Sequence, residues 1–308
     1  MNTFENPPAN IDNSAADEVE AEVELVEDDS QDIAEAEEKS EQIEKWETLL
    51  GPEKVTEIRE TIKGLEEPMK KMIEPVLENI KNGDYQLLIG DDASGRIPAL
   101  IMRKFINKAY EQAHQPPITT SFIAGFGGVT DADKVSSSYH PHHLKWLLLI
   151  KHLREKKKKS SSDISQALII TEYVNSGISF EPLIDGLKRS NITPTMLTVA
   201  LQGYDMLDEY SKSREERMGK ILKLDQFYAG DVVERPPALY SKKQMSGVTK
   251  DLLELHAEPI RKSKLRREDV PSDKEQEIMM ATMSIARDEA RHVTDNLIAE
   301  LLTPKDSH

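Results

Sequence analysis

Residues 167–187 read ALIITEYVNSGISFEPLIDGL, and their three parts predict a strand, a tight turn and a helix. The first part, residues 167–170, is apolar on both faces, which is typical of a strand buried in a parallel sheet. The turn contains Gly177 between Ser176 and Ser179, so it offers positive φ or close backbone approach together with two hydroxyl donors. A turn that enters a helix presents backbone N–H groups and the positive end of the helix dipole. We therefore expect residues 175–179 to bind a phosphate.

Short apolar runs alternate with helical patterns on both sides of this stretch. Strands are expected at residues 85–89, 118–124 and 196–201, and apolar spacing of three and four predicts helices at residues 97–113 and 141–157. The alternation predicts an α/β fold with a parallel or mostly parallel sheet flanked by helices.

Long helices are expected at both ends of the folded region. Apolar residues between 52 and 82 recur at helical spacing, and a methionine-rich helical stripe between 272 and 302 predicts either core packing or a homodimer interface. Residues 222–230 have a strand-like composition, but the pattern beyond Gly203 is otherwise irregular. The expected organisation is a disordered acidic tail at 1–44, a helical N-terminal extension at 45–84, an α/β core at 85–205, and a C-terminal extension at 206–308 that ends in a long helix.

The net charge of −16 is concentrated in the N-terminal tail. Residues 1–44 contain sixteen acidic side chains and a single basic one, Lys39, so residues 45–308 carry a net charge of only −1. Dense like charge with few apolar residues is typical of a disordered segment, which could recruit a protein partner. The near-neutral remainder lacks the basic surface of a nucleic-acid or membrane binder. The lysine run at 156–159 is expected to end a helix, where cations complement the helix dipole.

Several other classes of protein are excluded or disfavoured by composition. The chain has no cysteine, which excludes disulfides, thiolate metal sites and thiol nucleophiles. It has neither a basic-apolar leader at its N-terminus nor an apolar run of membrane-spanning length, so we expect a soluble, cytoplasmic protein. No GxxxxGK[ST] sequence is present, which disfavours a P-loop nucleotide triphosphatase.

The turn and the strand before it resemble the phosphate-binding signature of the type I phosphoribosyltransferases. That signature is a hydrophobic strand, two acids, two variable residues, and then threonine- or serine-rich residues around a glycine. On this pattern Glu172 takes the second acid and Thr171 stands where the first acid belongs. The remaining positions, which would hold the sugar 5-phosphate, are Asn175, Ser176, Gly177, Ile178 and Ser179.

The segments upstream match this family in order. GDDASGRIPALI, at 90–101, follows the first expected strand and stands where the resemblance implies a pyrophosphate loop, with Ser94, Gly95 and Arg96 as its contact residues. GFGGVTDADKVSSS, at 125–138, stands where the family has a flexible loop, and Lys134 is the cation in it. The resemblance covers residues 50–205.

The resemblance implies a pentosyltransferase that acts on phosphoribosyl pyrophosphate. A base or similar acceptor would displace pyrophosphate, with Mg²⁺ held by the substrate oxygens rather than by a protein cage. Glu172 would orient the ribose or magnesium-bound water, and Arg96 would balance the pyrophosphate charge. The flexible loop would close as a lid.

Two alternatives stay open at this point. Thr171 in place of an acid favours a non-catalytic sensor of a phosphoribosyl ligand, whereas the order of the three loops favours an enzyme. Asp91 and Asp92, with Ser94, fit a cap on the following helix as well as a substrate role. The acceptor is not readable from the sequence.

Overall fold

The computed structural model describes residues 34–91, 95–123, 141–159, 163–203, 208–235, 248–249, 258–259 and 272–303. The chain divides into two compact units, Met1–Gln42 and Ile43–His308, and the sheet belongs to the second. Most of the expected disordered tail lies outside the described residues. Its last part does not: helix α1, Ala34–Leu50, begins inside the acidic segment, because AEAEEKSEQIEKW is rich in strong helix formers.

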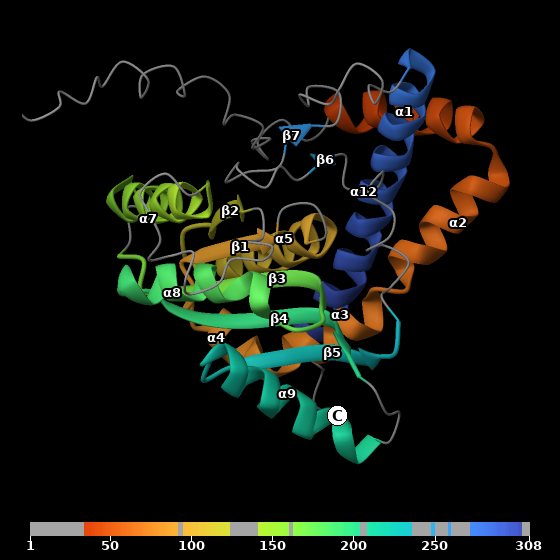
Figure 1. The fold of residues 1–308 in the computed structure, drawn as a ribbon. Helices are drawn as coiled ribbons and strands as arrows, with labels where there is room; N and C mark the ends of the chain where they lie inside the picture. The colour runs from red at the N-terminus through yellow and green to blue at the C-terminus, as the bar shows by residue number, and fades with distance from the viewer. Residues whose placement is uncertain are drawn as a thin grey trace, which may run out of the picture. The chain divides into compact units, whose positions relative to one another are not determined.

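A five-stranded sheet forms the centre of the second unit (Figure 1). Its strands lie in the order β2-β1-β3-β4-β5 and every neighbouring pair is parallel, so the expected α/β class and parallel sheet are confirmed. The strands are β1 Leu87–Asp91, β2 Thr119–Ile123, β3 Gln166–Val174, β4 Thr193–Gln202 and β5 Phe227–Val233. β1 is buried along its whole length, which explains its continuous apolar sequence.

Helices cover both faces of the sheet (Figure 1). One face carries the N-terminal helices, the helix after β1 and the C-terminal helix; the other carries the helices that follow β2, β3 and β4. The first group is α2 Pro52–Lys63, α3 Glu66–Ile73, the short 3₁₀ turn Glu74–Val76, α4 Leu77–Lys81, α5 Arg96–Gln112 and α12 Asp273–Leu301. The second group is α7 Pro141–Lys159, α8 Glu181–Arg189 and α9 Asp208–Leu222. A small antiparallel pair, β6 Val248–Thr249 and β7 Glu258–Pro259, lies apart from the main sheet.

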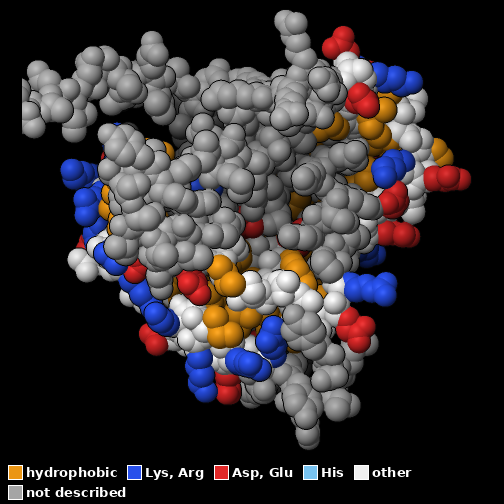
Figure 2. All heavy atoms as spheres, viewed as in Figure 1, with side chains coloured by type: hydrophobic (Ala, Val, Ile, Leu, Met, Phe, Trp, Pro, Cys, Tyr) orange, Lys and Arg blue, Asp and Glu red, His pale blue; other side chains and the backbone are white. Residues whose placement is uncertain are grey.

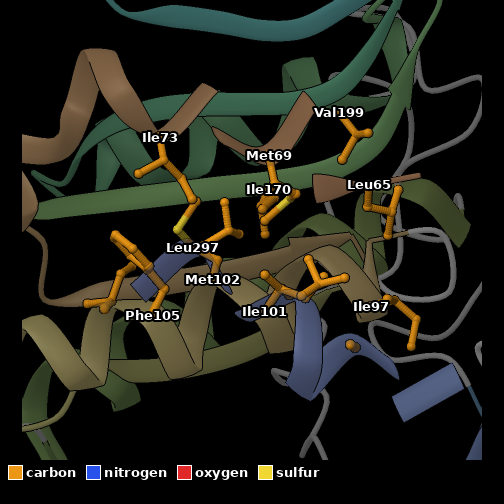
Figure 3. Close-up of a cluster of buried hydrophobic side chains, with 14 of the residues drawn as sticks. Leu65, Met69, Ile73, Ile97, Ile101, Met102, Phe105, Ile170, Val199 and Leu297 are labelled. Atoms are coloured by element: carbon orange, nitrogen blue, oxygen red, sulfur yellow. The ribbon is translucent and has the colours of Figure 1, made fainter. Parts of the chain in front are cut away.

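The core on the first face is continuous from the N-terminal helices to the C-terminal helix. Met69 of α3, Met102 of α5 and Leu297 of α12 point toward the same space above Ile170 of β3 (Figure 3). All four side chains are fully buried. The methionine-containing C-terminal helix is therefore part of the core, which confirms the expected core packing. Its role as a homodimer interface stays a prediction.

The long C-terminal helix begins with a capping box. The Ser272 hydroxyl accepts from the Glu275 amide at 3.4 Å, and the Glu275 carboxylate accepts from the Ser272 amide at 2.7 Å. These bonds satisfy donors that the first turn of a helix leaves open. The pKa of the Glu275 carboxyl is lowered chiefly by its hydrogen bond from the Ser272 side chain, and further by the bond from the Ser272 backbone.

The expected basic helix end is confirmed, since α7 closes with the lysine run at Lys159. Lys and Arg side chains gather at the left margin of the face in Figure 2, over α7 and α8. In α7 Lys151 and Arg154 are exposed, and in α8 Lys188 is exposed. In the part of the chain that the structure describes, no helix has both the length and the apolar character needed to cross a bilayer.

Candidate functional site

At one point of the sheet, between β1 and β3, the chain reverses the direction in which it adds strands. From β1 the chain moves to β2 on one side, and it then returns past β1 to β3 on the other. The carboxyl ends of β1 and β3 are therefore neighbours with loops that diverge. In open α/β sheets ligands bind beyond the carboxyl ends of the strands at such a switch point. The two segments singled out in the sequence, after β1 and after β3, both begin here.

The turn after β3 has the geometry that its sequence predicts. Asn175 and Ser176 are exposed, and Gly177 has a φ of +77°, a value that favours glycine. A single 3₁₀ turn, Ile178–Phe180, follows, in which the Phe180 amide donates to the Gly177 carbonyl at 2.9 Å, and α8 begins at once. The strand, turn and helix are thus present in order, while the phosphate role of residues 175–179 stays a prediction.

A side chain at position 177 would point into the protein interior. A Cβ placed on Gly177 would lie 3.0 Å from both Met218 Sδ and Leu222 Cδ2 of α9. In contrast, Ile178 is 47% exposed and Ser179 is half-buried. Glycine is therefore required for the backbone conformation and for packing against α9, and the outward surface of the turn is formed by its neighbours.

The loop after β1 lies tightly against the strand ends. The Gly95 amide donates to the Asp91 carbonyl at 2.7 Å, and a Cβ on Gly95 would lie 2.7 Å from the Ile170 carbonyl oxygen of β3. Only glycine fits this space, so α5 begins directly over the ends of β1 and β3. The first residue of α5 is Arg96, whose guanidinium lies over the Phe122 ring of β2 at 4.9 Å from the ring centre. Arg96 is thus held against β2 by a cation–π contact, and its predicted role beside pyrophosphate stays a prediction.

Two of the expected loop residues lie outside the described part of the chain. These are Ser94 in the loop after β1 and Lys134 in the glycine-rich segment at 125–138. Their predicted roles in holding pyrophosphate and closing the site stay predictions. Asp92 also falls outside the described residues.

Two of the buried charged residues belong to the strands that meet at this edge of the sheet. Within the described ranges, the buried charged side chains are Asp91, Lys145 and Glu172, at 6%, 1% and 0% exposed. Asp91 ends β1 and Glu172 lies near the end of β3. Charged side chains are rarely buried without a structural or functional reason, because they lose their hydration. Two of the three therefore belong to β1 and β3, the strands of the switch point, which makes this edge chemically distinctive.

The direction of α7 places Lys145 toward the carboxyl end of β2. The Ser121 Oγ of β2 and the His152 Nε2 of α7 are 2.8 Å apart, which fixes the middle of α7 beside β2. Because α7 follows β2 and precedes the parallel strand β3, it runs antiparallel to the strands. Lys145 comes two turns before His152, about 10 Å nearer the carboxyl edge. Sequence reasoning missed it, since a single lysine on a helix with lysines at its other end gives no signal of burial.

Asp91 and Thr171 are in direct contact. The Thr171 hydroxyl donates to Asp91 Oδ2 at 3.4 Å, and the pairing of Gly90 with Ile170 places the two residues side by side on adjacent strands. The N-cap position of α5 is Gly95, which has no side chain to make a capping hydrogen bond. The two interpretations of Asp91, as a cap together with Asp92 and Ser94 or as a substrate contact, both stay predictions, because residues 92–94 lie outside the described part of the chain.

A polar chain on the other side of β3 connects the edge to α9. The Tyr173 hydroxyl donates to the Gln202 side-chain oxygen at 2.7 Å, and Arg214 Nε donates to the Gln202 carbonyl at 3.0 Å. Helix α9 was not anticipated from the sequence, so its contribution to the edge was missed as well.

The comparisons with known proteins give no family. No family model, no curated protein and no solved structure matches this chain. The residues and geometry of the switch point are therefore the basis for inferring what the protein binds.

Proposed function

We propose that this protein binds phosphoribosyl pyrophosphate or a related sugar 5-phosphate at the carboxyl edge between β1 and β3. The observation that carries the proposal is the turn after β3, where Gly177 adopts φ +77° directly between a buried strand and a helix. The backbone N–H groups at 176–179 and the positive dipole end of the following helix are suited to the 5-phosphate. Two of the three buried charged side chains among the described residues, Asp91 and Glu172, belong to the strands at this edge, which supports a site for a polar sugar.

We further propose that the bound ligand transfers its phosphoribosyl group to a base or similar acceptor, with release of pyrophosphate. Arg96, at the start of α5, would balance the charge of the leaving pyrophosphate, and Glu172 would orient the ribose hydroxyls. The start of α5 adds its positive dipole end at the same place. The protein needs no strong base in this reaction, because positioning and charge stabilisation dominate when a good leaving group departs.

Magnesium fits this proposal as a companion of the ligand. Mg²⁺ favours phosphate oxygens, water and one or two carboxylates, and Glu172 is the carboxylate we assign to it. Among the described residues, no group of three or more His, Cys, Asp or Glu side chains is placed to hold a metal by itself. Bound to the pyrophosphate, the ion would supply neutralising charge.

A thermal-shift titration with phosphoribosyl pyrophosphate and Mg²⁺ tests binding. At one hundred times the dissociation constant, the ligand should stabilise the protein by about 2.7 kcal/mol. For a chain of this size that corresponds to a rise in Tm of about 5–10 °C. No rise at millimolar ligand would overturn the proposal.

A pair of charge variants assigns the binding to the turn. Ser176 is exposed in the turn, and Thr193 is exposed at the start of β4, on the opposite edge of the same sheet. Ser176→Glu should weaken binding by at least about tenfold, because a carboxylate beside the phosphate is repulsive. Thr193→Glu adds the same charge and should leave the affinity unchanged. Equal affinities of the two variants would show that the phosphate is not held at this turn.

A sensor that binds without turnover is the second candidate function, and Thr171 in the place of an acid favours it. Once binding is established, pyrophosphate release across a panel of nucleobases separates the two functions. Release with any base supports the enzyme, and tight binding without release supports the sensor.

A further inference from the structure

Helix α7 turns one face into the core and leaves exposed side chains on the opposite face. Leu149 and Leu153 are buried in the core that α7 shares with the sheet. Leu147 and Leu148 are 46% and 47% exposed, and among the exposed large apolar side chains of the described ranges they are the two that adjoin in the chain. Single exposed apolar residues are common, whereas an adjoining pair on the outer face of a packed helix marks an interaction surface.

Basic side chains continue this exposed face toward the C-terminal end of α7. At 3.6 residues per turn, Lys151, Arg154 and Lys158 lie in line with Leu147. All three are exposed, and they extend the line to about 16 Å along the helix. The acid on this face, Glu155, lies 3.9 Å from Lys151. The outer stripe of α7 is therefore a pair of leucines followed by three cations and one anion: Leu147, Leu148, Lys151, Arg154, Glu155 and Lys158.

Helix α8 adds to the positive charge beside this stripe. Lys188 and Arg189 are exposed at its end, and the Arg189 guanidinium lies 5.3 Å from the centre of the Trp146 ring of α7. Arg189 pairs with Asp185 at 2.9 Å, so Lys188 is the residue that adds net charge. Figure 2 shows Lys and Arg side chains gathered over these two helices. The exposed leucines are bordered by positive charge, which is complementary to an acidic partner.

We propose that the outer stripe of α7 binds an acidic amphipathic helix of another protein. Apolar side chains of that helix cover Leu147 and Leu148, and its carboxylates face the three cations. The length of the stripe matches about three turns of a partner helix. This inference does not depend on the proposed sugar-phosphate site.

A nucleic acid or an anionic membrane fits the stripe less well. Nucleic-acid phosphates are bound by basic and polar groups, so the two exposed leucines would have no use there. A helix that lies in a membrane surface inserts a broad apolar face, whereas the broad apolar face of α7 is turned toward the sheet. A partner that carries both apolar and acidic residues uses the whole stripe.

Fluorescence anisotropy of a labelled peptide, titrated with the full-length protein, tests the proposal. The probe is a peptide of about five helical turns, built from leucine and glutamate with the leucines at helical spacing. A scrambled peptide of the same composition is its control. The protein should bind the probe more tightly than the scrambled peptide. Leu147→Ser/Leu148→Ser and Lys151→Glu/Arg154→Glu should each weaken binding of the probe by about tenfold or more.

A double variant on α9 is the matched control for these substitutions. Lys220→Glu/Ile221→Ser changes an exposed lysine and an apolar side chain that is 42% exposed, and it should leave the affinity unchanged. Circular dichroism checks that each variant is folded, and the charge variant alone decides the test if the leucine variant is not. Equal binding of the probe and the scrambled peptide, or an equal loss in the α9 variant, would overturn the proposal.

Two further probes separate a protein partner from the other classes. The same titration is made with vesicles of phosphatidylcholine and phosphatidylserine and with duplex DNA. Neither should bind in a way that depends on the stripe. If vesicles or DNA bind through Leu147, Leu148, Lys151 and Arg154 while the amphipathic peptide does not, the proposed protein partner is overturned.

Discussion

Replacing Gly95 with alanine tests whether the loop after β1 is pressed against the strand ends. A Cβ at this position would lie 2.7 Å from the Asp91 nitrogen, 2.7 Å from the Ile170 carbonyl oxygen and 2.8 Å from the Asp91 carbonyl oxygen. All three neighbours are backbone atoms of the central strands, so none can rotate away. Overpacking usually costs about 1–3 kcal/mol, and with immovable neighbours we expect the upper end, about 3 kcal/mol. The corresponding fall in Tm is about 6–12 °C.

Gly64→Ala is the matched control for this substitution. Gly64 also has a right-handed backbone at a helix end, but a Cβ there meets its nearest neighbours at 3.4 Å, an ordinary contact distance. We expect its free energy of unfolding to stay within about 1 kcal/mol of wild type, since alanine also restricts the unfolded chain. Urea unfolding followed by circular dichroism measures both variants. If Gly95→Ala is as stable as Gly64→Ala, the close approach of the loop to β1 and β3 is refuted.

Four further substitutions, one of them a control, test other parts of the structure. Gly177→Ala should lower the free energy of unfolding by about 1–2 kcal/mol for the left-handed φ alone, plus the cost of the contact with α9, and wild-type stability in urea would contradict this turn geometry. Ile285→Ala should lower the free energy of unfolding by about 2–5 kcal/mol because Ile285 is fully buried. Met280 is 41% exposed on the same helix, so Met280→Ala should change it by less than about 0.5 kcal/mol. Similar losses of the two variants in thermal unfolding would refute the packing of α12. Because the pKa of Glu275 is lowered in the folded protein, its stabilising effect is present above the ordinary pKa of 4.5 and is lost as the pH falls through the lower folded value. The difference in free energy of unfolding between wild type and Glu275→Gln should therefore shrink between pH 7 and pH 3. A difference that does not depend on pH would be evidence against the capping role of Glu275.

The strongly periodic parts of the sequence allow the fold to be anticipated. The C-terminal helix and α7 were predicted close to their observed limits because apolar residues recur at helical spacing over several turns. β3 was expected only at residues 167–170 but runs from Gln166 to Val174. The extension carries Thr171 and Glu172, which look polar in sequence but are fully buried at the site.

Helix α9 shows where sequence reasoning failed. Its first part, DEYSKSREER, is almost entirely polar. Among the side chains whose burial the structure describes, from Arg214 onward, the buried apolar ones are Met218 and Leu222, near its end. No apolar stripe was therefore visible. As a consequence, the positive φ of Gly177 could be anticipated from its turn, but its packing against α9 could not.

The contacts of the site depend on strand register, which is not readable from local sequence. The two members of the Asp91–Thr171 hydrogen bond are 80 residues apart, and they meet only because β1 and β3 pair directly. Burial of Lys145 likewise depends on the direction of α7 relative to the sheet. The residue types at 175–179 located the turn, whereas the residues around it are determined by the pairing of the strands and the direction of the helices.

A crystal structure of the protein with ribose 5-phosphate tests the central claim most directly. Our account predicts that the 5-phosphate oxygens accept hydrogen bonds from backbone N–H groups at 176–179, with the sugar directed toward Glu172. A sugar phosphate bound elsewhere, or an empty turn at saturating ligand, would contradict it.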